Sequence, residues 1–358
     1  MHSRRLLQTP DRRQFLAGVL LALLAGTIGG AIFFIASIPL PWMLGSMIIV
    51  AVGAASGAPF KRSMPLRRLM LVVMGLLLGS FFTADTFSHL GKWTVLAALV
   101  SAYVVAMTGA SLSIFRRVGG MNLPTAYFSS TPGGLGPMTI AGEEAGGDNQ
   151  LIPVSHMIRI FCVVISVPIY LTLSEGLDLT SRSSTISLGL DLPQVRDWLF
   201  WIGCAISGLW CAKAMRLPFA EVLGPMLASA GVYSLGLVSV PIPGLITIAA
   251  QIVIGTSIGA QFSNLRRGFL LRAIAASIGS TFMMLTGAIL LSHWIGPAVG
   301  MDPISLLLAL VPGGLVEMGL IAVSIDADTA FVGAMHIWRI FLIAVSAPLL
   351  FRFFWRPN

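Results

Sequence analysis

The feature that most constrains this fold is an internal duplication. Residues 131–170 read TPGGLGPMTIAGEEAGGDNQLIPVSHMIRIFCVVISVPIY, and residues 311–350 read VPGGLVEMGLIAVSIDADTAFVGAMHIWRIFLIAVSAPLL, with no gap between the aligned copies. Both copies carry Pro-Gly-Gly, then His-x-x-Arg-Ile-Phe, then Ser-x-Pro. A stretch that recurs at a fixed offset, here 180 residues, is typical of a repeated structural unit. The chain is therefore expected to fold as two homologous repeats.

Composition places both repeats in a lipid bilayer. Only 10% of the residues are charged and 56% are hydrophobic, whereas a soluble domain is about 25% charged. Apolar runs of about 20 residues, long enough to cross a bilayer, follow one another along the chain. The expected fold class is an all-α polytopic membrane protein. Its net charge of +8 fits loops at the membrane surface and does not require nucleic acid as a direct partner.

The duplication also predicts the domain boundaries. A basic cytoplasmic tail is expected at 1–14, a first membrane repeat at 15–173, a polar linker at 174–197 and a second membrane repeat at 198–355. Glycine patterns that recur at matching places in both repeats support this division. Small residues four apart also let membrane helices approach closely. These patterns are Leu44-Gly45-x-Met47 with Leu223-Gly224-x-Met226, and Gly75-x-x-x-Gly79 with Gly255-x-x-x-Gly259.

The positive charges discriminate between two ways of threading the chain. If each Pro-Gly-Gly segment crosses the membrane, each repeat has six spans and the repeats are parallel. If each segment re-enters, each repeat has five crossings plus one broken segment, and the repeats are inverted. Inversion puts 17 Lys and Arg residues in the cytoplasm: Arg4, Arg5, Arg12, Arg13, Lys61, Arg62, Arg67, Arg68, Arg116, Arg117, Lys213, Arg216, Arg266, Arg267, Arg272, Arg352 and Arg356.

Only Lys92, Arg182 and Arg196 would then lie outside, which is 17 against 3, whereas parallel repeats give 14 against 6. Positive residues collect on the cytoplasmic side, so inverted repeats are expected, with both chain termini in the cytoplasm. In particular, Arg266 is predicted to be cytoplasmic and Arg182 periplasmic.

The Pro-Gly-Gly segments predict breaks in apolar helices. Proline lacks an amide hydrogen and glycine weakens a helix, so each segment should leave free backbone groups at membrane depth. Such irregular backbone is tolerated only inside protein or beside a water-filled cavity. Matching broken segments in two inverted repeats are the best pointer from sequence to a transporter site. An ordinary kink or a surface loop is the alternative interpretation.

A buried-looking His and Arg follow each break, three residues apart and hence on one helix face. A charge deep in an apolar helix should face the interior and have a partner. A structural ion pair and a role in substrate handling both remain open. The candidate substrate- or ion-binding residues are Pro132, Gly133, Gly134, His156, Arg159, Pro312, Gly313, Gly314, Glu317, His336 and Arg339; the candidate charge partners are Glu143, Glu144, Asp148, Asp326 and Asp328.

The duplicated Pro-Gly-Gly segment, the His-x-x-Arg-Ile-Phe helices and Pro-Trp-Met-Leu-Gly at Pro41–Gly45 resemble the bacterial AbrB-duplication membrane protein family. The resemblance covers about residues 20–355. It implies a multi-pass protein of the bacterial inner membrane and, for one member, a link to regulation of gene expression. It carries no site residues over to this chain. Members are often labelled ammonia monooxygenase.

That enzyme label conflicts with the residues present. A copper oxygenase needs clustered histidine and carboxylate ligands, and the five histidines are spread over the chain as His2, His89, His156, His293 and His336. We therefore expect no enzyme, no cofactor and no metal.

The preferred function is movement of a small, anionic solute through a transporter-like core. The alternative is a membrane sensor that acts indirectly on gene expression, and a membrane monooxygenase is the least favoured. The expected partners are the bilayer and a small-molecule or ion ligand, and a homo-oligomer is compatible with the sequence.

Overall fold

A computed structural model describes residues 12–354 except 39, 83–85, 87–89, 177–192, 218, 239, 241, 265 and 266. All regular secondary structure in these residues is helical. The predicted side of the membrane for Arg182 and Arg266 concerns positions outside the described residues, as do most of the expected tail and linker.

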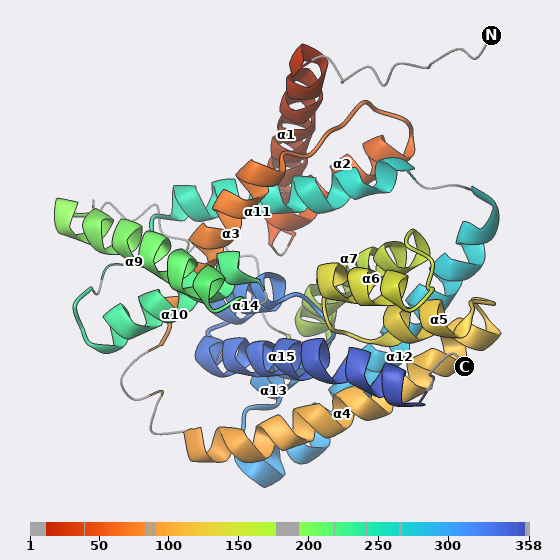
Figure 1. The fold of residues 1–358 in the computed structure, drawn as a ribbon. Helices are drawn as coiled ribbons and strands as arrows, with labels where there is room; N and C mark the ends of the chain where they lie inside the picture. Colours follow the sequence, from red (N-terminus) through yellow and green to blue (C-terminus); the bar gives the residue numbers. More distant parts are fainter. Residues whose placement is uncertain are drawn as a thin grey trace. The chain divides into compact units, whose positions relative to one another are not determined.

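The helices follow the apolar runs of the sequence closely (Figure 1). In chain order they are α1 (Arg12–Ile35), α2 (Pro41–Ala55), α3 (Met64–Gly79), α4 (Leu90–Arg117), α5 (Leu123–Ser130), α6 (Leu135–Glu144), α7 (Leu151–Ser174), α9 (Val195–Ala214), α10 (Ala220–Ser234), α11 (Gly244–Gly259), η2 (Ala260–Asn264), α12 (Arg267–Ile295), η3 (Pro297–Val299), α13 (Pro303–Leu310), α14 (Leu315–Ser324) and α15 (Thr329–Phe354).

Six stretches within the described residues are long and apolar enough to cross a membrane. They are Arg12–Ile35, Trp93–Arg117, Leu151–Ser174, Gly244–Phe262, Leu271–Ile295 and Thr329–Phe354. Many of their large apolar side chains are exposed on the protein surface, for example Leu24, Leu173 and Trp294. Such a surface suits lipid rather than water, so the prediction of an all-α, membrane-embedded protein is confirmed at this level.

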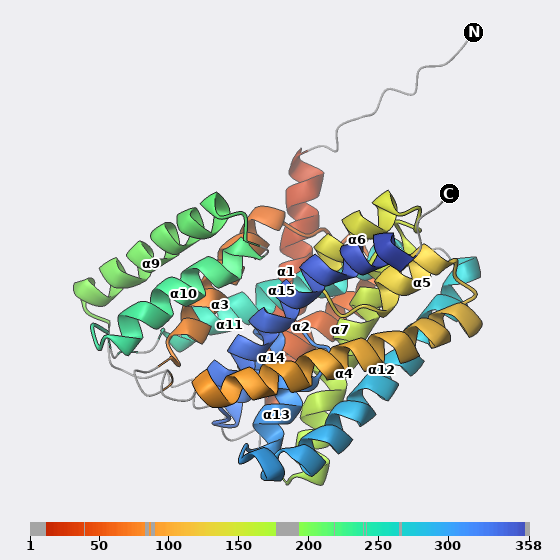
Figure 2. The same cartoon turned by 60° about the horizontal axis from the view of Figure 1, so that its bottom comes forward.

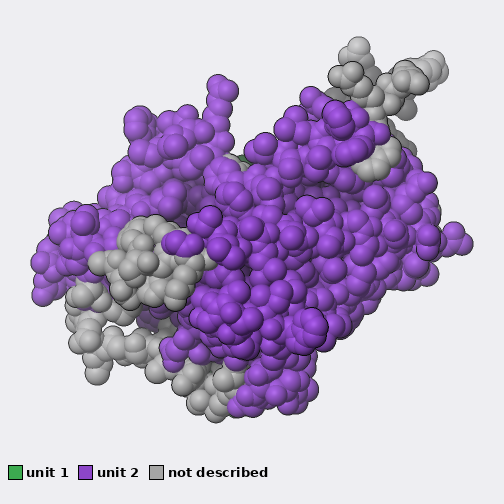
Figure 3. All heavy atoms as spheres, turned by 90° about the horizontal axis from the view of Figure 1, so that it is seen from below, with its two compact units in different colours: residues 1–70, 248–265 green, residues 71–247, 266–358 purple. Residues whose placement is uncertain are grey.

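The described chain forms two compact units, coloured separately in Figure 3. Unit 1 comprises residues 1–70 and 248–265, and unit 2 comprises residues 71–247 and 266–358. Helix α3 contributes to both units, and so does α11. This grouping by contact does not test the expected division into two sequence repeats, which stays a prediction.

Unit 1 is held together by close backbone approach at glycines. Helix α1 packs against α2 where Gly29 meets Gly45, and a Cβ atom at either position would collide with the other's backbone. Gly255 and Gly259 of α11 likewise lie against the backbone of α2, at Met43 and Met47. Small residues therefore bring these helices into contact, as expected in lipid.

Unit 2 contains the same two contacts, made by the matching residues. Gly208 of α9 meets Gly224 of α10, as Gly29 meets Gly45 in unit 1. Gly75 and Gly79 of α3 lie against the backbone of α10, at Val222 and Met226. The third long helix of each sequence repeat thus packs on the second helix of the other repeat.

The rest of unit 2 is built from two pairs of short helices, α5–α6 and α13–α14, and four long helices. Helix α7 packs against α12, α15 packs against α4, and α4 packs against α12 (Figure 2). The Oη of Tyr103 in α4 donates a hydrogen bond to the carbonyl of Met284 in α12. These contacts again join one repeat to the other.

Valine substitutions at two glycines of α9 test the close packing. We expect Gly208→Val to cost about 1–3 kcal/mol, because its side chain would overlap the backbone of α10. Gly203→Val is the matched control on the same helix, since Gly203 faces open space, and its effect should stay within about 0.5 kcal/mol. Thermal unfolding of the purified variants in detergent measures both. Equal effects of the two substitutions would contradict this account of α9.

Candidate functional site

Each Pro-Gly-Gly segment separates two short helices. In the first repeat, the Asn122 side chain caps α5 by accepting from the Thr125 N–H, and the helix ends at Ser130. Pro132 cannot continue the helix. Gly134 has a φ of 89°, which favours glycine, and it is the N-cap of α6. Asp302 caps α13 in the same way, through the Ser305 N–H.

Both helix pairs are closed at their base, so each is a helical hairpin. The N–H of Asp148, after α6, donates to Oγ1 of Thr125, in the first turn of α5, at 2.8 Å. The N–H of Asp328 donates to Oγ of Ser305 at 3.1 Å, which is the matching contact of the second hairpin. The start of each hairpin therefore lies beside its end, and the Pro-Gly-Gly segment forms the tip.

The two aspartates also start the following long helices. Oδ1 of Asp148 accepts from the N–H groups of Gln150 and Leu151, at 2.7 and 3.0 Å. Oδ1 of Asp328 accepts from the Phe331 N–H at 2.9 Å. Side-chain caps of this kind satisfy amides that have no partner within the helix. These carboxylates therefore orient α7 and α15 against the hairpins.

Arg159 and Arg339 bind the hairpin tips. The guanidinium of Arg159 donates to the carbonyls of Ser129 and Thr131, at 3.3 and 3.4 Å. That of Arg339 donates to the carbonyls of Val311 and Gly313, at 2.7 and 2.8 Å. The last carbonyls of a helix lack intrahelical partners and carry partial negative charge. Each arginine thus neutralises the end of one broken helix.

The two arginines are both buried in unit 2, at most 5% exposed. Around them the repeats interlock, since α14 packs against α7 and α6 packs against α15. Gly133 at the first tip lies against Ile343 of α15. Among the predicted site residues, Arg339 is hydrogen-bonded to the carbonyl of Gly313, and Arg159 to that of Thr131, next to Pro132.

The two histidines differ in their contacts. Nδ1 of His156 accepts from Arg159 at 2.6 Å, so Nε2 carries the proton and donates to the carbonyl of Phe128 at 2.9 Å. Nδ1 of His336 donates to the carbonyl of Val332, within its own helix, at 3.0 Å. Both rings are fully buried. His156 therefore supports the first hairpin, whereas His336 does not bond to the second through the matching contact.

Glu317 makes the two hairpin tips chemically different. Its side chain is only 8% exposed, and its carboxylate lies against the Cα of Gly314, at the start of α14. A negative charge is favoured at a helix N-terminus. The matching position in α6 is Pro137, and the first turn of α6 contains no acidic residue. Helix α14 therefore begins beside a carboxylate of its own first turn, whereas α6 does not.

The remaining predicted carboxylates lie at the surface. Glu143, Glu144 and Asp326 are exposed, and Glu144 forms an ion pair with Arg352 at 3.7 Å, both side chains being more than half exposed. The hydrogen bonds of Arg159 and Arg339 described above go to carbonyl oxygens and to His156 rather than to carboxylates. The role of the predicted acids as partners of these arginines stays a prediction.

Sequence reasoning missed the residues that close the hairpins. Asn122 and Thr125 match Asp302 and Ser305 at the same offset, and each pair is polar within an apolar segment. That repeated polar spacing was the available signal. It also missed Tyr127, whose Oη donates to the carbonyl of Ala347 at 3.0 Å and joins the first hairpin to α15.

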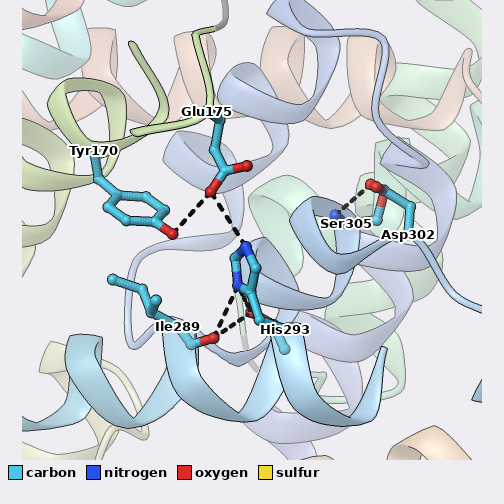
Figure 4. A network of polar contacts seen from close by, with 7 residues as sticks. Tyr170, Glu175, Ile289, His293, Asp302 and Ser305 are labelled. Atoms are coloured by element: carbon cyan, nitrogen blue, oxygen red, sulfur yellow. Dashed lines mark hydrogen bonds and ion pairs between the residues drawn. The ribbon is translucent and has the colours of Figure 1, made fainter. Parts of the chain in front are cut away.

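A second polar cluster lies at the C-terminal ends of α7 and α12 (Figure 4). The carboxylate of Glu175 accepts from Tyr170 Oη at 2.9 Å and faces Nε2 of His293 at 3.2 Å, while His293 Nδ1 lies 3.0 Å from the Ile289 carbonyl. These groups are partly exposed, so the cluster joins two helix ends rather than forming a buried site. Among the described residues, no group of three or more His, Cys, Asp or Glu could hold a metal ion.

Replacing Arg159 by leucine tests the capping role. We expect Arg159→Leu to lower the free energy of unfolding by about 1–3 kcal/mol, because two buried carbonyls lose their donor. Arg352→Leu removes an exposed arginine and should change it by no more than about 0.5 kcal/mol. Unfolding of both variants in detergent, followed by circular dichroism, gives the comparison. An unchanged stability of Arg159→Leu would mean that the arginine does not hold the tip.

Two curated proteins are similar to this chain over most of their length. YhjN of Bacillus subtilis (strain 168) is 25% identical over 355 residues, which covers 90% of this chain and 90% of that protein. A protein of Escherichia coli (strain K12), named as a regulator AbrB, is 24% identical over 325 residues, covering 90% of this chain and 92% of that protein.

A family model described as "Transition state regulatory protein AbrB" matches residues 42–355. The match includes both hairpins, both buried arginines and the glycine contacts of α2, α3, α10 and α11. The chain therefore belongs to the AbrB family.

Proposed function

We propose that this protein is a secondary transporter for a small anionic solute, built from two inverted repeats in the bacterial inner membrane. One observation carries the proposal: unit 2 contains two hairpins from different repeats, each with an arginine-capped tip, and the second helix of each packs on the long helix that follows the other. Discontinuous helices from matching positions of two repeats form the substrate sites of many transporters.

The closed hairpin bases support inversion of the repeats. A segment whose start and end are hydrogen-bonded to each other begins and ends at the same depth. Each hairpin would then enter and leave the bilayer on one side, which gives five crossings per repeat. An odd number of crossings inverts the second repeat relative to the first. The Lys and Arg distribution favours the same topology, with both termini in the cytoplasm.

The buried charges support an anionic solute. Around the tips, the buried charged side chains among the described residues are Arg159, Arg339 and Glu317, which leaves one positive charge in excess. An uncompensated charge in a buried site is costly, and a monoanion would balance it. The start of α6, which lacks an acidic residue, is a favourable place for such a group.

Transport also fits the name of the relative in Escherichia coli (strain K12), which calls that protein a regulator. Moving a signalling metabolite across the membrane would change gene expression without any contact with DNA. We therefore propose that any regulatory effect of this chain is indirect, and we propose no enzymatic activity.

Labelling of cysteines at the two ends of α9 tests the topology. In a variant with Cys162, Cys204 and Cys211 replaced by alanine, Arg196→Cys should react with an impermeant maleimide from outside, and Lys213→Cys should react only after the cells are opened. Arg196 is 65% exposed and Lys213 is also exposed, so reagent access is not limiting. The reverse pattern would establish parallel repeats and exclude inversion.

Metabolite profiling tests transport and the role of Glu317. A deletion strain should differ from the wild type in the distribution of at least one small anion between cells and medium, and wild-type protein should restore it. We expect Glu317→Gln to restore it less than one tenth as well, because the charge balance at the tips changes while the shape does not. Glu144→Gln, at an exposed carboxylate, is the matched control and should restore it fully.

Two outcomes would contradict the proposal. Changes in gene expression without a change in any solute would favour a sensor. Full restoration by Glu317→Gln, at an equal protein level, would remove this carboxylate from the transport site.

A further inference from the structure

The two matching histidines present different atoms to the interior of unit 2. Both nitrogens of His156 are used, one by Arg159 and one by the Phe128 carbonyl. His336 donates from Nδ1 to the Val332 carbonyl, so a neutral ring has its lone pair at Nε2. That Nε2 is buried and has no hydrogen-bond partner among the described residues. The second repeat therefore offers a free acceptor where the first repeat has none.

A free donor lies on the same helix face. Nε of Arg339 is also buried and lacks a partner in the part of the chain that the structure describes, although both terminal nitrogens of this guanidinium bind the second hairpin tip. Residues three apart on a helix share a face, so His336 and Arg339 place an acceptor and a donor on the same face of α15. Each buried polar atom left unsatisfied costs about 1–3 kcal/mol. Native proteins retain such atoms chiefly where a ligand or an ordered water completes them.

Charge restricts what could satisfy both atoms. The N–H of Arg339 suits an anionic oxygen, since a charge-assisted hydrogen bond is the stronger kind. The lone pair of His336 needs a donor, and the neighbouring arginines would repel an ammonium group. A neutral hydroxyl is the donor that remains. One carboxylate would neutralise the single excess positive charge around the tips, whereas a phosphate dianion would leave one negative charge in excess.

We propose that His336 Nε2 and Arg339 Nε form a binding pair for a small hydroxycarboxylate, the arginine binding its carboxylate and the histidine its hydroxyl. This inference rests on the proposed transport function and deepens it by naming the substrate class. It assigns a binding role to His336, whereas His156 holds the first hairpin. The scaffold is thus duplicated, but the recognition of the hydroxyl belongs to one repeat.

Matched pairs of small acids test the binding pair through the hydroxyl group alone. The probes are lactate against propionate and glycolate against acetate, since the members of each pair differ by one hydroxyl. Binding to the purified full-length protein in detergent is followed through the rise in unfolding temperature with acid concentration. We expect the wild type to bind each hydroxy acid at least about tenfold more tightly than its partner, as one buried hydrogen bond would give.

Variants at the two histidines separate recognition from structure. His336→Leu should reduce the preference for the hydroxy acid to about onefold, at a smaller loss of stability than His156→Leu. His336→Gln, whose side-chain oxygen can reach the place of Nε2, should restore part of the preference. His156→Leu, or His156→Gln if the leucine variant does not fold, should keep the preference while losing stability.

The outcomes distinguish this inference from the function on which it rests. Equal binding of hydroxylated and plain acids by the wild type, or a preference that survives His336→Leu, would overturn the binding pair while leaving anion transport standing. In that case an ordered water satisfies His336. If none of the four acids protects the wild type, the proposal of a small carboxylate site itself fails.

Discussion

Hydrogen bonds from two buried arginines to the ends of broken helices are the interaction on which the rest of this structure depends. A helix that stops inside an apolar environment leaves carbonyl groups that neither water nor the next turn can satisfy. Arg159 and Arg339 satisfy them from the following helices. Without these donors, the carbonyls at the tips would be buried without partners. The same bonds fix where the charges lie, because each guanidinium is oriented by carbonyls rather than by a flexible carboxylate.

Much of this arrangement could be predicted from the sequence, because a helix break or a charge that recurs at the same place in both copies is a feature of the fold. The long apolar helices and the burial of Arg159 and Arg339 followed from pattern and hydropathy. The carbonyl partners of the arginines did not follow, because backbone carbonyls carry no sequence signal. The closed hairpin bases were missed for a related reason: Thr125 and Ser305 look like ordinary polar residues until the chain folds back. The ring contacts of His156 and His336 depend on side-chain orientation, which identical motifs cannot reveal.

The two repeats match in their helix packing but differ in the charged and hydrogen-bonding side chains at a few positions. The glycine contacts, the helix caps and the hairpin closures recur at matching positions, whereas Glu317 faces Pro137 across the alignment and the two histidines bond differently. The differences at Glu317 and at the two histidines leave the glycine contacts between helices unchanged. A duplicated framework can therefore keep its packing while one asymmetric site diverges within it. Specificity therefore depends on the positions that differ between the repeats, and stability depends on the positions that match.

The exchange of glycine contacts between repeats has a consequence for how the protein is made. Gly75 and Gly79 of α3 find their partner only in α10, which is synthesised about 140 residues later. Until α10 has been synthesised, the surface of α3 that carries Gly75 and Gly79 lacks the helix on which it packs. Neither repeat thus completes its packing by itself, because α3 of the first packs on α10 of the second. A gene fragment that encodes only one repeat would produce a chain that has to pair with a second copy to bury these surfaces.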